Sequence, residues 1–234
     1  LPAHRVASAV PAALPTGEPR SAVNGTALLL LSLALVAAVV DWIAVTRDNR
    51  PLEYVCKPLV MVLLIGVALA IDPSDAFGGS AEAVRWWFVA ALALCLLGDV
   101  LLMLPQDLFV FGLAAFLLGH LGYIIGLHVI GVEGGRFLVG IVVVMVAVAV
   151  LGTLILRSVR AGPDPSLAGP VVAYMFVISA MVASAIGTGH VAAVAGAGSF
   201  YVSDALIAWN RFVRETPHAR VAIMVTYHLA QVGL

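Results

Sequence analysis

The sequence predicts an all-α protein, a polytopic membrane bundle of eight transmembrane helices. Two observations carry this prediction. Of the 234 residues 62% are apolar, and only 12 are basic and 13 acidic, whereas about a quarter of the residues in a soluble domain are charged and under half are apolar. The apolar residues also form continuous runs, which is typical of membrane helices and not of the alternating strands of a membrane barrel.

The chain length agrees with this fold. A helix needs about 20 apolar residues to cross the hydrocarbon core, so eight spans use roughly 160 positions and leave short loops. Residues 1–25 are rich in Ala, Pro, Ser and Gly and have no apolar period, so we predict a flexible N-terminal tail. Residues 26–234 are predicted to form one transmembrane domain. Its spans are expected at residues 26–45, 52–71, 84–104, 108–130, 136–157, 168–188, 190–212 and 217–234.

Uncharged apolar stretches and the prolines between them support these spans. The first, fifth and sixth overlap the stretches 21–40, 137–156 and 165–189, which have no Asp, Glu, Lys, Arg or His and can each cross a bilayer unaided. The remaining spans carry isolated ionisable residues. Residues that suit a helix start or stop lie at their joins, namely Pro51, Pro73, Pro105 and Pro217. Small residues four positions apart, such as Gly122 and Gly126, are expected to let helices approach closely.

The composition excludes several partners and cofactors. The basic residues are scattered singly or in pairs, unlike the basic stripe that binds nucleic acid phosphates, so no nucleic acid partner is expected. Cys56 and Cys95 lie in apolar runs, and we interpret them as small core residues. Without an HxxxH or HxxE spacing, neither a metal ion nor another cofactor is expected. The sequence predicts an integral, multi-pass protein of a bacterial-type plasma membrane and leaves its oligomeric state open.

Four charged residues inside the predicted spans gather toward one membrane face. Asp41, Asp99 and Asp204 lie near the C-terminal ends of odd-numbered spans, and Lys57 lies near the start of the second. Asp99 is about 8 Å deep at 1.5 Å per residue. Because an unpaired carboxylate at that depth costs at least about 2.5–3.5 kcal/mol, Asp99 is expected to face the bundle interior, paired or protonated. Asp41 is expected to be interfacial rather than catalytic.

Other polar side chains share helix faces with these charges, and together they predict a polar core. Two roles are open for Lys57, an ion pair with one of the aspartates or contact with a lipid phosphate. The uncharged or neutral members are His120 and Tyr123 on the fourth span, Tyr227 and Gln231 on the eighth, and Tyr54 one turn before Lys57 on the second.

A short sequence similarity between the third and seventh spans suggests an internal repeat of four plus four spans, a 4+4 repeat. GDVLLM in the third span is followed by Tyr123, 24 residues after Asp99, and SDALIA in the seventh is followed by Tyr227, 23 residues after Asp204. A displacement of four spans would make the two halves parallel repeats. Because the match is short, chance stays an alternative explanation.

Five segments become informative when they are taken in order. They are EYVCKPLVM, LLGDVLLM, FVFGLAAFLLGHLGY, GAGSFYVSDALIAWNRF and TYHLAQ, which together run from about residue 50 to the C-terminus. This ordered set resembles the YhhN-like lysoplasmalogenase family of eight-span membrane proteins. The resemblance implies hydrolysis of the vinyl ether bond of a lysoplasmalogen, with a lysophospholipid substrate among membrane lipids as partner. The family's polar positions fall on Lys57, Asp99, His120, Tyr123, Asp204, Tyr227 and Gln231.

The chemistry of such a reaction suits the acidic residues. A vinyl ether is hydrolysed when its β carbon accepts a proton and water attacks the resulting oxocarbenium ion. The reaction needs a neutral acid and a nearby negative charge, which two carboxyls in different surroundings supply in glycosidases. We predict that one of Asp99 and Asp204 donates the proton while the other stabilises the cation and positions water. Which one donates stays open at this point.

The remaining polar residues receive supporting roles in this hypothesis. His120 is expected to orient water or relay the proton. The expected substrate-binding residues are Tyr54, Tyr123 and Tyr227 for polar oxygens of the lipid, and Lys57 or Gln231 for its phosphate.

Two other classes of protein fit the same pattern. A proton-coupled secondary transporter of a lipid-like or small solute also has paired intramembrane carboxylates, a lysine and a repeat. A non-catalytic lipid-binding protein would tolerate replacement of Asp99 by Asn. Release of aldehyde by the purified protein separates both from a hydrolase.

Overall fold

The computed structural model describes residues 24–234, and every regular element among them is a helix. Residues 1–23 of the predicted tail lie outside the described residues. Asn24 already caps the first helix, because its Oδ1 accepts a hydrogen bond from the backbone N–H of Ala27 at 2.9 Å. In order the elements are α1 (Gly25–Thr46), α2 (Arg50–Ala70), α3 (Ser74–Phe77), η1 (Gly78–Ser80), α4 (Ala81–Met103), α5 (Phe109–Ile130), α6 (Gly134–Ala147), η2 (Val148–Gly152), α7 (Thr153–Ala161), η3 (Pro165–Leu167), α8 (Ala168–Thr188), α9 (Val191–Phe212) and α10 (Ala219–Gly233).

Within the described residues, seven helical segments are long and apolar enough to cross a membrane. They match the first seven predicted spans, although the third begins at Gly78 rather than near residue 84. The expected eighth span is also helical, but α10 has only 15 residues. At 1.5 Å per residue it is about 22 Å long, shorter than the roughly 30 Å of a hydrocarbon core.

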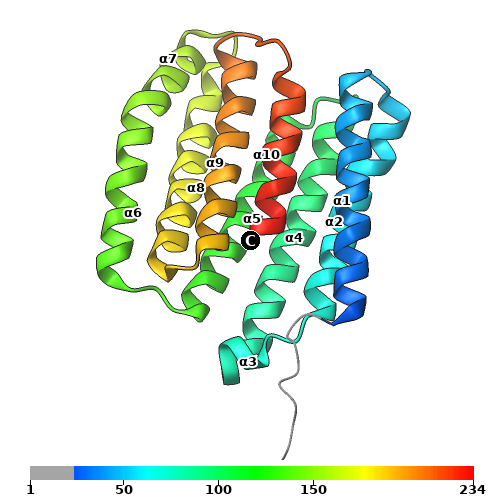
Figure 1. The fold of residues 1–234 in the computed structure, drawn as a ribbon. Helices are drawn as coiled ribbons and strands as arrows, with labels where there is room; N and C mark the ends of the chain where they lie inside the picture. Colours follow the sequence, from blue (N-terminus) through cyan, green and yellow to red (C-terminus); the bar gives the residue numbers. More distant parts are fainter. Residues whose placement is uncertain (1–23) are drawn as a thin grey trace, which may run out of the picture.

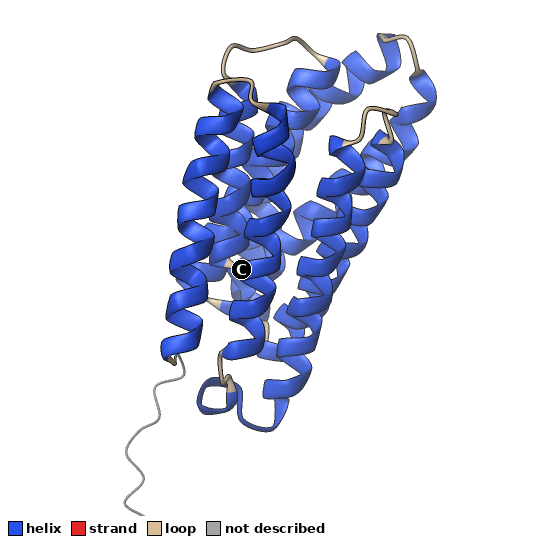
Figure 2. Cartoon of the chain, turned by 90° about the vertical axis from the view of Figure 1, so that its right-hand side faces the viewer, coloured by secondary structure: helices blue, strands red, loops and turns tan. Residues whose placement is uncertain are grey.

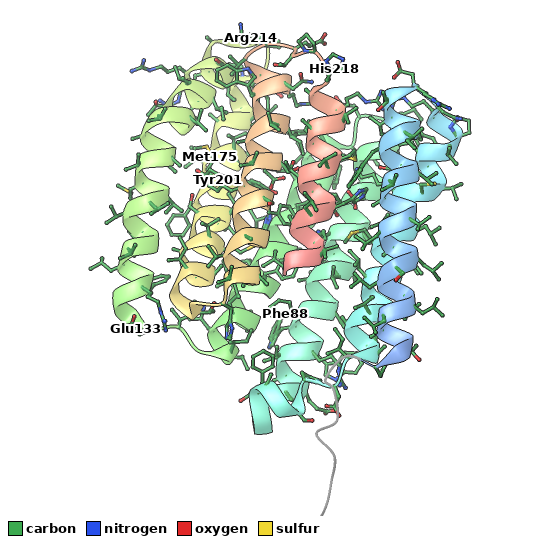
Figure 3. All side chains as sticks on the ribbon, viewed as in Figure 1. Phe88, Glu133, Met175, Tyr201, Arg214 and His218 are labelled. Carbon is green, nitrogen blue, oxygen red and sulfur yellow. The ribbon has the colours of Figure 1, made fainter. Side chains whose placement is uncertain are left out.

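The long helices run along one direction, with α1 and α2 on one side of the bundle, α6, α8 and α9 on the other, and α4, α5 and α10 between them (Figure 1). Seen from the side, the loops gather at the two ends (Figure 2). We call the end where α1, α4, α7 and α9 finish the upper end. Arg214 and His218 lie there, and Glu133 lies at the opposite end (Figure 3).

Close helix packing in the centre of the bundle depends on glycine, as the small-residue spacing predicts. A Cβ atom on Gly122 of α5 would lie 3.2 Å from Cβ of Ala91 on α4, and one on Gly126 would lie 2.6 Å from the ring of Phe88. Contacts this short leave no room for a larger side chain. The small residues therefore let α4 and α5 approach through van der Waals packing rather than a hydrophobic force.

The fifth span is interrupted. The helix begins at Gly134, where the side chain of Glu133 accepts hydrogen bonds from the backbone N–H groups of Gly135 and Arg136. These amides, with that of Arg136 first, hold the pKa of the Glu133 carboxyl below its usual range. Halfway along, the π-helical segment η2 separates α6 from α7, an irregularity that often marks a functional region.

Candidate functional site

The first part of the polar core surrounds Asp99. Lys57 of α2 places its Nζ 3.0 Å from Oδ1 of Asp99, and the hydroxyl of Tyr227 on α10 donates to Oδ2 at 2.5 Å. Asp99 and Lys57 are only 1% and 6% exposed. The predicted ion pair of Lys57 is therefore formed with Asp99, and three helices meet at one carboxylate whose charge is paired and hydrogen-bonded.

The second part surrounds Asp204 on α9. The hydroxyl of Tyr174 on α8 donates a hydrogen bond to Oδ2 of Asp204, and Nε2 of His120 on α5 lies 3.8 Å from the same oxygen. No lysine or arginine makes an ion pair with this carboxyl within the described residues. Asp204 thus has a hydrogen-bonding phenol and a nearby imidazole where Asp99 has an ammonium group.

Aromatic rings join the two parts. The ring centroid of Phe200 lies 4.5 Å from that of His120 and 5.5 Å from that of Tyr227. Phe116 also contacts both rings, with its centroid 6.2 Å from that of Phe200 and 5.8 Å from that of Tyr227. The two aspartates, 105 positions apart in sequence, therefore belong to one cluster in the bundle interior.

His120 is the least satisfied member of this cluster. Its side chain is fully buried, and neither ring nitrogen has a hydrogen-bond partner among the described residues. Buried polar groups are normally paired. The 3.8 Å gap between Nε2 and the Asp204 carboxyl leaves both groups able to contact a third polar atom.

Two further predicted residues lie beside the cluster. The hydroxyl of Tyr123 donates to Oε1 of Gln231 at 2.5 Å, which links α5 to α10. Both side chains are buried. Neither makes a direct hydrogen bond to Asp99 or Asp204 in the structure.

Two sequence-based expectations differ from the structure. Tyr54 is 43% exposed, and its hydroxyl donates to the backbone oxygen of Met103 at 2.9 Å, so the structure does not bring it into the cluster. The expectation that Asp41 is interfacial is wrong, because its side chain is fully buried. Helical position alone does not say which side of a helix faces its neighbours, and this explains both differences.

Tyr174 is a site residue that the sequence reasoning missed. It lies in the sixth span, inside a stretch without Asp, Glu, Lys, Arg or His. The only signal available was that it is the single tyrosine of that stretch. Its partner is 30 positions away on the next span, so only the fold shows the contact.

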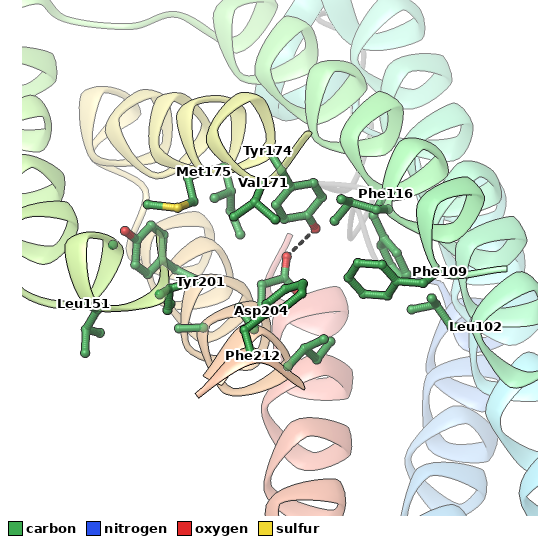
Figure 4. Close-up of a pocket in the computed structure, with 17 residues that line it drawn as sticks. Leu102, Phe109, Phe116, Leu151, Val171, Tyr174, Met175, Tyr201, Asp204 and Phe212 are labelled. Carbon is green, nitrogen blue, oxygen red and sulfur yellow. Dashed lines mark hydrogen bonds between the residues drawn. The ribbon is translucent and has the colours of Figure 1, made fainter. Parts of the chain in front are cut away.

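An apolar pocket opens beside Asp204 (Figure 4). Side chains from α4, α5, η2, α7, α8 and α9 line it, and Asp204 is its one acidic residue. The space between these side chains, with the open solvent at its mouth included, is about 750 Å³. Asp204 lies eight residues before the last residue of α9, about 12 Å below the upper end. A long apolar chain in this pocket would therefore reach the carboxyl.

Residues 24–234 contain no group of three His, Cys, Asp or Glu side chains arranged to hold a metal ion. The side chains of the cluster offer two carboxyls, an imidazole, an ammonium group and phenols. These groups can hold, give and accept protons next to an apolar ligand.

This fold and site define an integral, multi-pass helical membrane protein with paired acidic groups beside an apolar pocket. The chain belongs to the YhhN family, whose model matches residues 52–234. That range contains every residue of the cluster.

Characterised relatives carry one common name. The chain is 31% identical to the human lysoplasmalogenase TMEM86B over 175 residues, which are 75% of this chain and 70% of the relative. It is 31% identical to the pig protein of the same name over 185 residues, covering 79% and 75% of the two chains. A lysoplasmalogenase of Mycobacterium tuberculosis is 36% identical over 154 residues, 63% of this chain and 58% of the relative. No solved structure matches the chain.

Proposed function

We propose that this protein is a membrane lysoplasmalogenase, which hydrolyses the vinyl ether bond of a 1-alkenyl glycerophosphocholine or glycerophosphoethanolamine. The products are a fatty aldehyde and the glycerophosphodiester. The observation that carries the proposal is the position of Asp204 in the wall of an apolar pocket, with a second, ion-paired carboxyl in the same cluster. The names of the relatives support it.

Asp204 is the proton donor in this mechanism. It faces the pocket and lacks a cationic partner among the described residues, and an apolar site without a cation favours a neutral carboxylic acid. Its proton goes to the β carbon of the vinyl ether, which converts the ether into an oxocarbenium ion. The hydroxyl of Tyr174 then stabilises the carboxylate that remains.

Asp99 supplies the negative charge. The Lys57 ammonium and the Tyr227 hydroxyl hold it as a carboxylate, and a carboxylate stabilises a cation that forms nearby. His120, with two unpartnered nitrogens beside Asp204, is suited to orient water or relay a proton. Water attack gives a hemiacetal that breaks down to the aldehyde and the alcohol.

The lipid's polar groups require contacts of their own. In this proposal Lys57 and Gln231 are candidates for the phosphate, and Tyr123 and Tyr227 for the glycerol oxygens. Tyr54 lies apart from these groups. We therefore leave it outside the mechanism.

We also propose that α10 is the eighth span and that the bundle is a 4+4 repeat. Each aspartate contacts one residue from the preceding span of its own half and one from the last span of the other half. For Asp99 these residues are Lys57 and Tyr227, and for Asp204 they are Tyr174 and His120. Each half thus contributes one residue of its last span to the aspartate of the other half. Two halves related by a two-fold axis would make this reciprocal contribution. Membrane thinning accommodates a helix as short as α10.

The experiment is aldehyde release by the full-length protein in detergent. Choline and ethanolamine lysoplasmalogens are the substrates, and lysolipids with an ester bond are the comparison. We expect aldehyde from the vinyl ether lipids only. A transporter or a lipid-binding protein gives none, because neither breaks the bond.

Replacement of either aspartate tests the two-carboxyl mechanism. Asp204→Asn and Asp99→Asn are expected to lower kcat by about 10²–10⁴-fold, the usual contribution of a general acid or base. Asp107→Asn is the matched control, because Asp107 is 70% exposed and pairs with Arg211 at the upper end. The mechanism would be contradicted if Asp204→Asn and Asp99→Asn both kept the activity of the parent protein.

A further inference from the structure

A second group of buried polar side chains lies between α1, α2 and α10, and the mechanism above does not use it. Asp41 on α1 is fully buried, and neither carboxyl oxygen has a hydrogen-bond partner among the described residues. His228 on α10 is 1% exposed. An unpaired buried carboxyl is costly, so its presence calls for a binding partner.

The hydrogen bond of His228 defines the role of each ring nitrogen. Nδ1 lies 3.0 Å from Nε1 of Trp42, which is a donor only. Nδ1 is therefore the acceptor, and in the neutral ring Nε2 carries the hydrogen. Nε2 is buried and has no partner among the described residues. The region thus contains one free N–H donor and two free carboxyl oxygens.

Tyr227 links this group to the ion pair of the proposed active site. Its ring centroid lies 5.6 Å from that of His228, and Nζ of Lys57 lies 5.8 Å from the same ring centroid. His228 also follows Tyr227, which donates to Asp99. One side chain, Tyr227, therefore separates His228 from the carboxylate that we assign to cation stabilisation.

A line of charged residues connects this region with the upper end. Glu53 lies one turn before Lys57 on α2 and is 7% exposed. Arg220 of α10 binds Glu53 through Nη2 and Asp48 through Nη1, both at 2.7 Å. Asp48 is 82% exposed at the end of the bundle. Charged and polar groups therefore follow one another from the aqueous end to Asp99.

The apolar pocket lies on different helices. Its lining comes from α4, α5, η2, α7, α8 and α9, and no residue of α1, α2 or α10 takes part. In Figure 1 these last three helices occupy the centre and the far side of the bundle relative to α6 and α7. The two approaches to the cluster therefore differ in polarity.

We infer that Asp41 and His228 hold a buried water molecule between α1, α2 and α10, and that this site supplies the water that hydrolyses the lipid. Water accepts a hydrogen bond from Nε2–H of His228 and donates to the Asp41 carboxyl. Buried waters typically make about three hydrogen bonds to polar groups that have no other partner. The site deepens the proposed function and rests on it: lipid reaches the cluster from the Asp204 side and water from the Asp99 side.

The step is balanced. The water oxygen forms a bond to the positively charged carbon of the oxocarbenium ion. One water proton returns to the cluster and replaces the proton that Asp204 has donated. The hemiacetal then breaks its carbon–oxygen bond to glycerol, and the hydroxyl proton moves to the leaving oxygen.

X-ray radiolysis followed by mass spectrometry tests the water site without turnover. Hydroxyl radicals form from water where it is bound and oxidise adjacent sulfur atoms. Met61 on α2 is the reporter, because its Sδ lies 3.4 Å from the Tyr227 hydroxyl. Met181 on α8 is the matched control, since both methionines are 0% exposed. Cys56, which directly precedes Lys57 on α2 and is 6% exposed, is a second reporter.

In the parent protein we expect Met61 and Cys56 to be oxidised several times faster than Met181. Asp41→Leu should remove this excess, whereas Asp41→Asn should keep it because an amide also holds water. Equal oxidation of Met61 and Met181 in the parent would overturn the inference even if no variant folds. Excess oxidation that survives in folded Asp41→Leu would also overturn it.

Kinetics test the link to catalysis. Asp41→Leu is expected to lower kcat about tenfold or more with little change in KM, because water and not lipid binding is affected. Asp107→Asn, at an exposed ion pair of the upper end, should stay near the parent. If Asp41→Leu had the same kcat as the parent protein, the water held at this site would not be the reactant. Absence of aldehyde from the parent would instead defeat the proposed function, and the radiolysis result would stand separately.

Discussion

Asp99 and Asp204 have identical side chains and opposite surroundings. Lys57 gives Asp99 a cationic partner at 3.0 Å, while Asp204 has a phenol and an imidazole beside an apolar pocket. The chemical nature of a carboxyl depends on such neighbours more than on its identity. This difference divides the acid and the charge-stabilising roles between them.

The Lys57–Asp99 pair predicts a specific pattern of stability. Lys57→Met leaves the Asp99 carboxylate buried without its cation, which costs about 3–5 kcal/mol. Adding Asp99→Asn to the same chain removes the unpaired charge, so most of the lost stability should return while activity does not. Thermal unfolding in detergent measures both variants. An unchanged unfolding temperature in Lys57→Met alone would contradict the pairing.

Tyr174 predicts an effect on rate rather than on folding. Its hydrogen bond to Asp204 strengthens when the acid becomes a carboxylate, and a hydrogen bond to a charged group contributes about 1.5–3 kcal/mol. Tyr174→Phe should therefore lower kcat by about 10–100-fold. Tyr54→Phe loses a hydroxyl that bonds only to the Met103 backbone and serves as control. The assignment fails if the two variants have equal kcat values.

Among the elements, the interrupted fifth span shapes the pocket. Leu151 and Gly152 of η2 both line it. A Cβ atom on Gly152 would collide with the terminal methyl of Met175, which is itself a lining residue. Because that methyl is the end of a flexible side chain, a larger residue at position 152 displaces it toward the pocket and leaves the helices in place.

Gly152→Val is accordingly expected to change chain-length preference. The displaced Met175 shortens the space for the apolar tail, so kcat/KM for long alkenyl chains should fall by about tenfold relative to short ones, as expected when a pocket loses room for one or two methylenes. Gly169→Val on α8 meets no atom within 4 Å and should leave the ratio unchanged. An unchanged ratio in Gly152→Val would place the tail elsewhere.

Sequence reasoning predicts the elements well because hydrophobic length is a local property. The seven long spans and the close approach at Gly122 and Gly126 follow from it. The burial of Asp41 and the contact of Tyr174 with Asp204 do not, since both depend on which helix faces are neighbours. The pocket also escapes prediction, because six different elements line it.

At the scale of the whole molecule, the two halves of the proposed 4+4 arrangement complete each other's contacts. Asp99 receives Tyr227 from the second half, and His120 of the first half lies beside Asp204. The loop between α5 and α6, near Gly131 and Glu133, is the boundary. Neither half contains a complete set of contacts for its own aspartate.

A divided chain should consequently work only when both parts are present. Residues 1–132 and 133–234, co-expressed, are expected to assemble and recover aldehyde release, because nearly all contacts between them are between helices. Each part alone should be inactive. Activity from one part expressed singly would contradict the exchange of residues between halves, and aldehyde assays on membranes from the three strains measure it.

The apolar lining beside Asp204 and the charged residues from Asp48 to Lys57 have a consequence for product release. A fatty aldehyde dissolves in hydrocarbon, and a glycerophosphodiester dissolves in water. Once the bond between them breaks, each product partitions into its own phase, and the reverse reaction requires them to meet again across a phase boundary. The protein leaves this equilibrium unchanged, but its two sides of different polarity let each product leave the cluster toward its own phase.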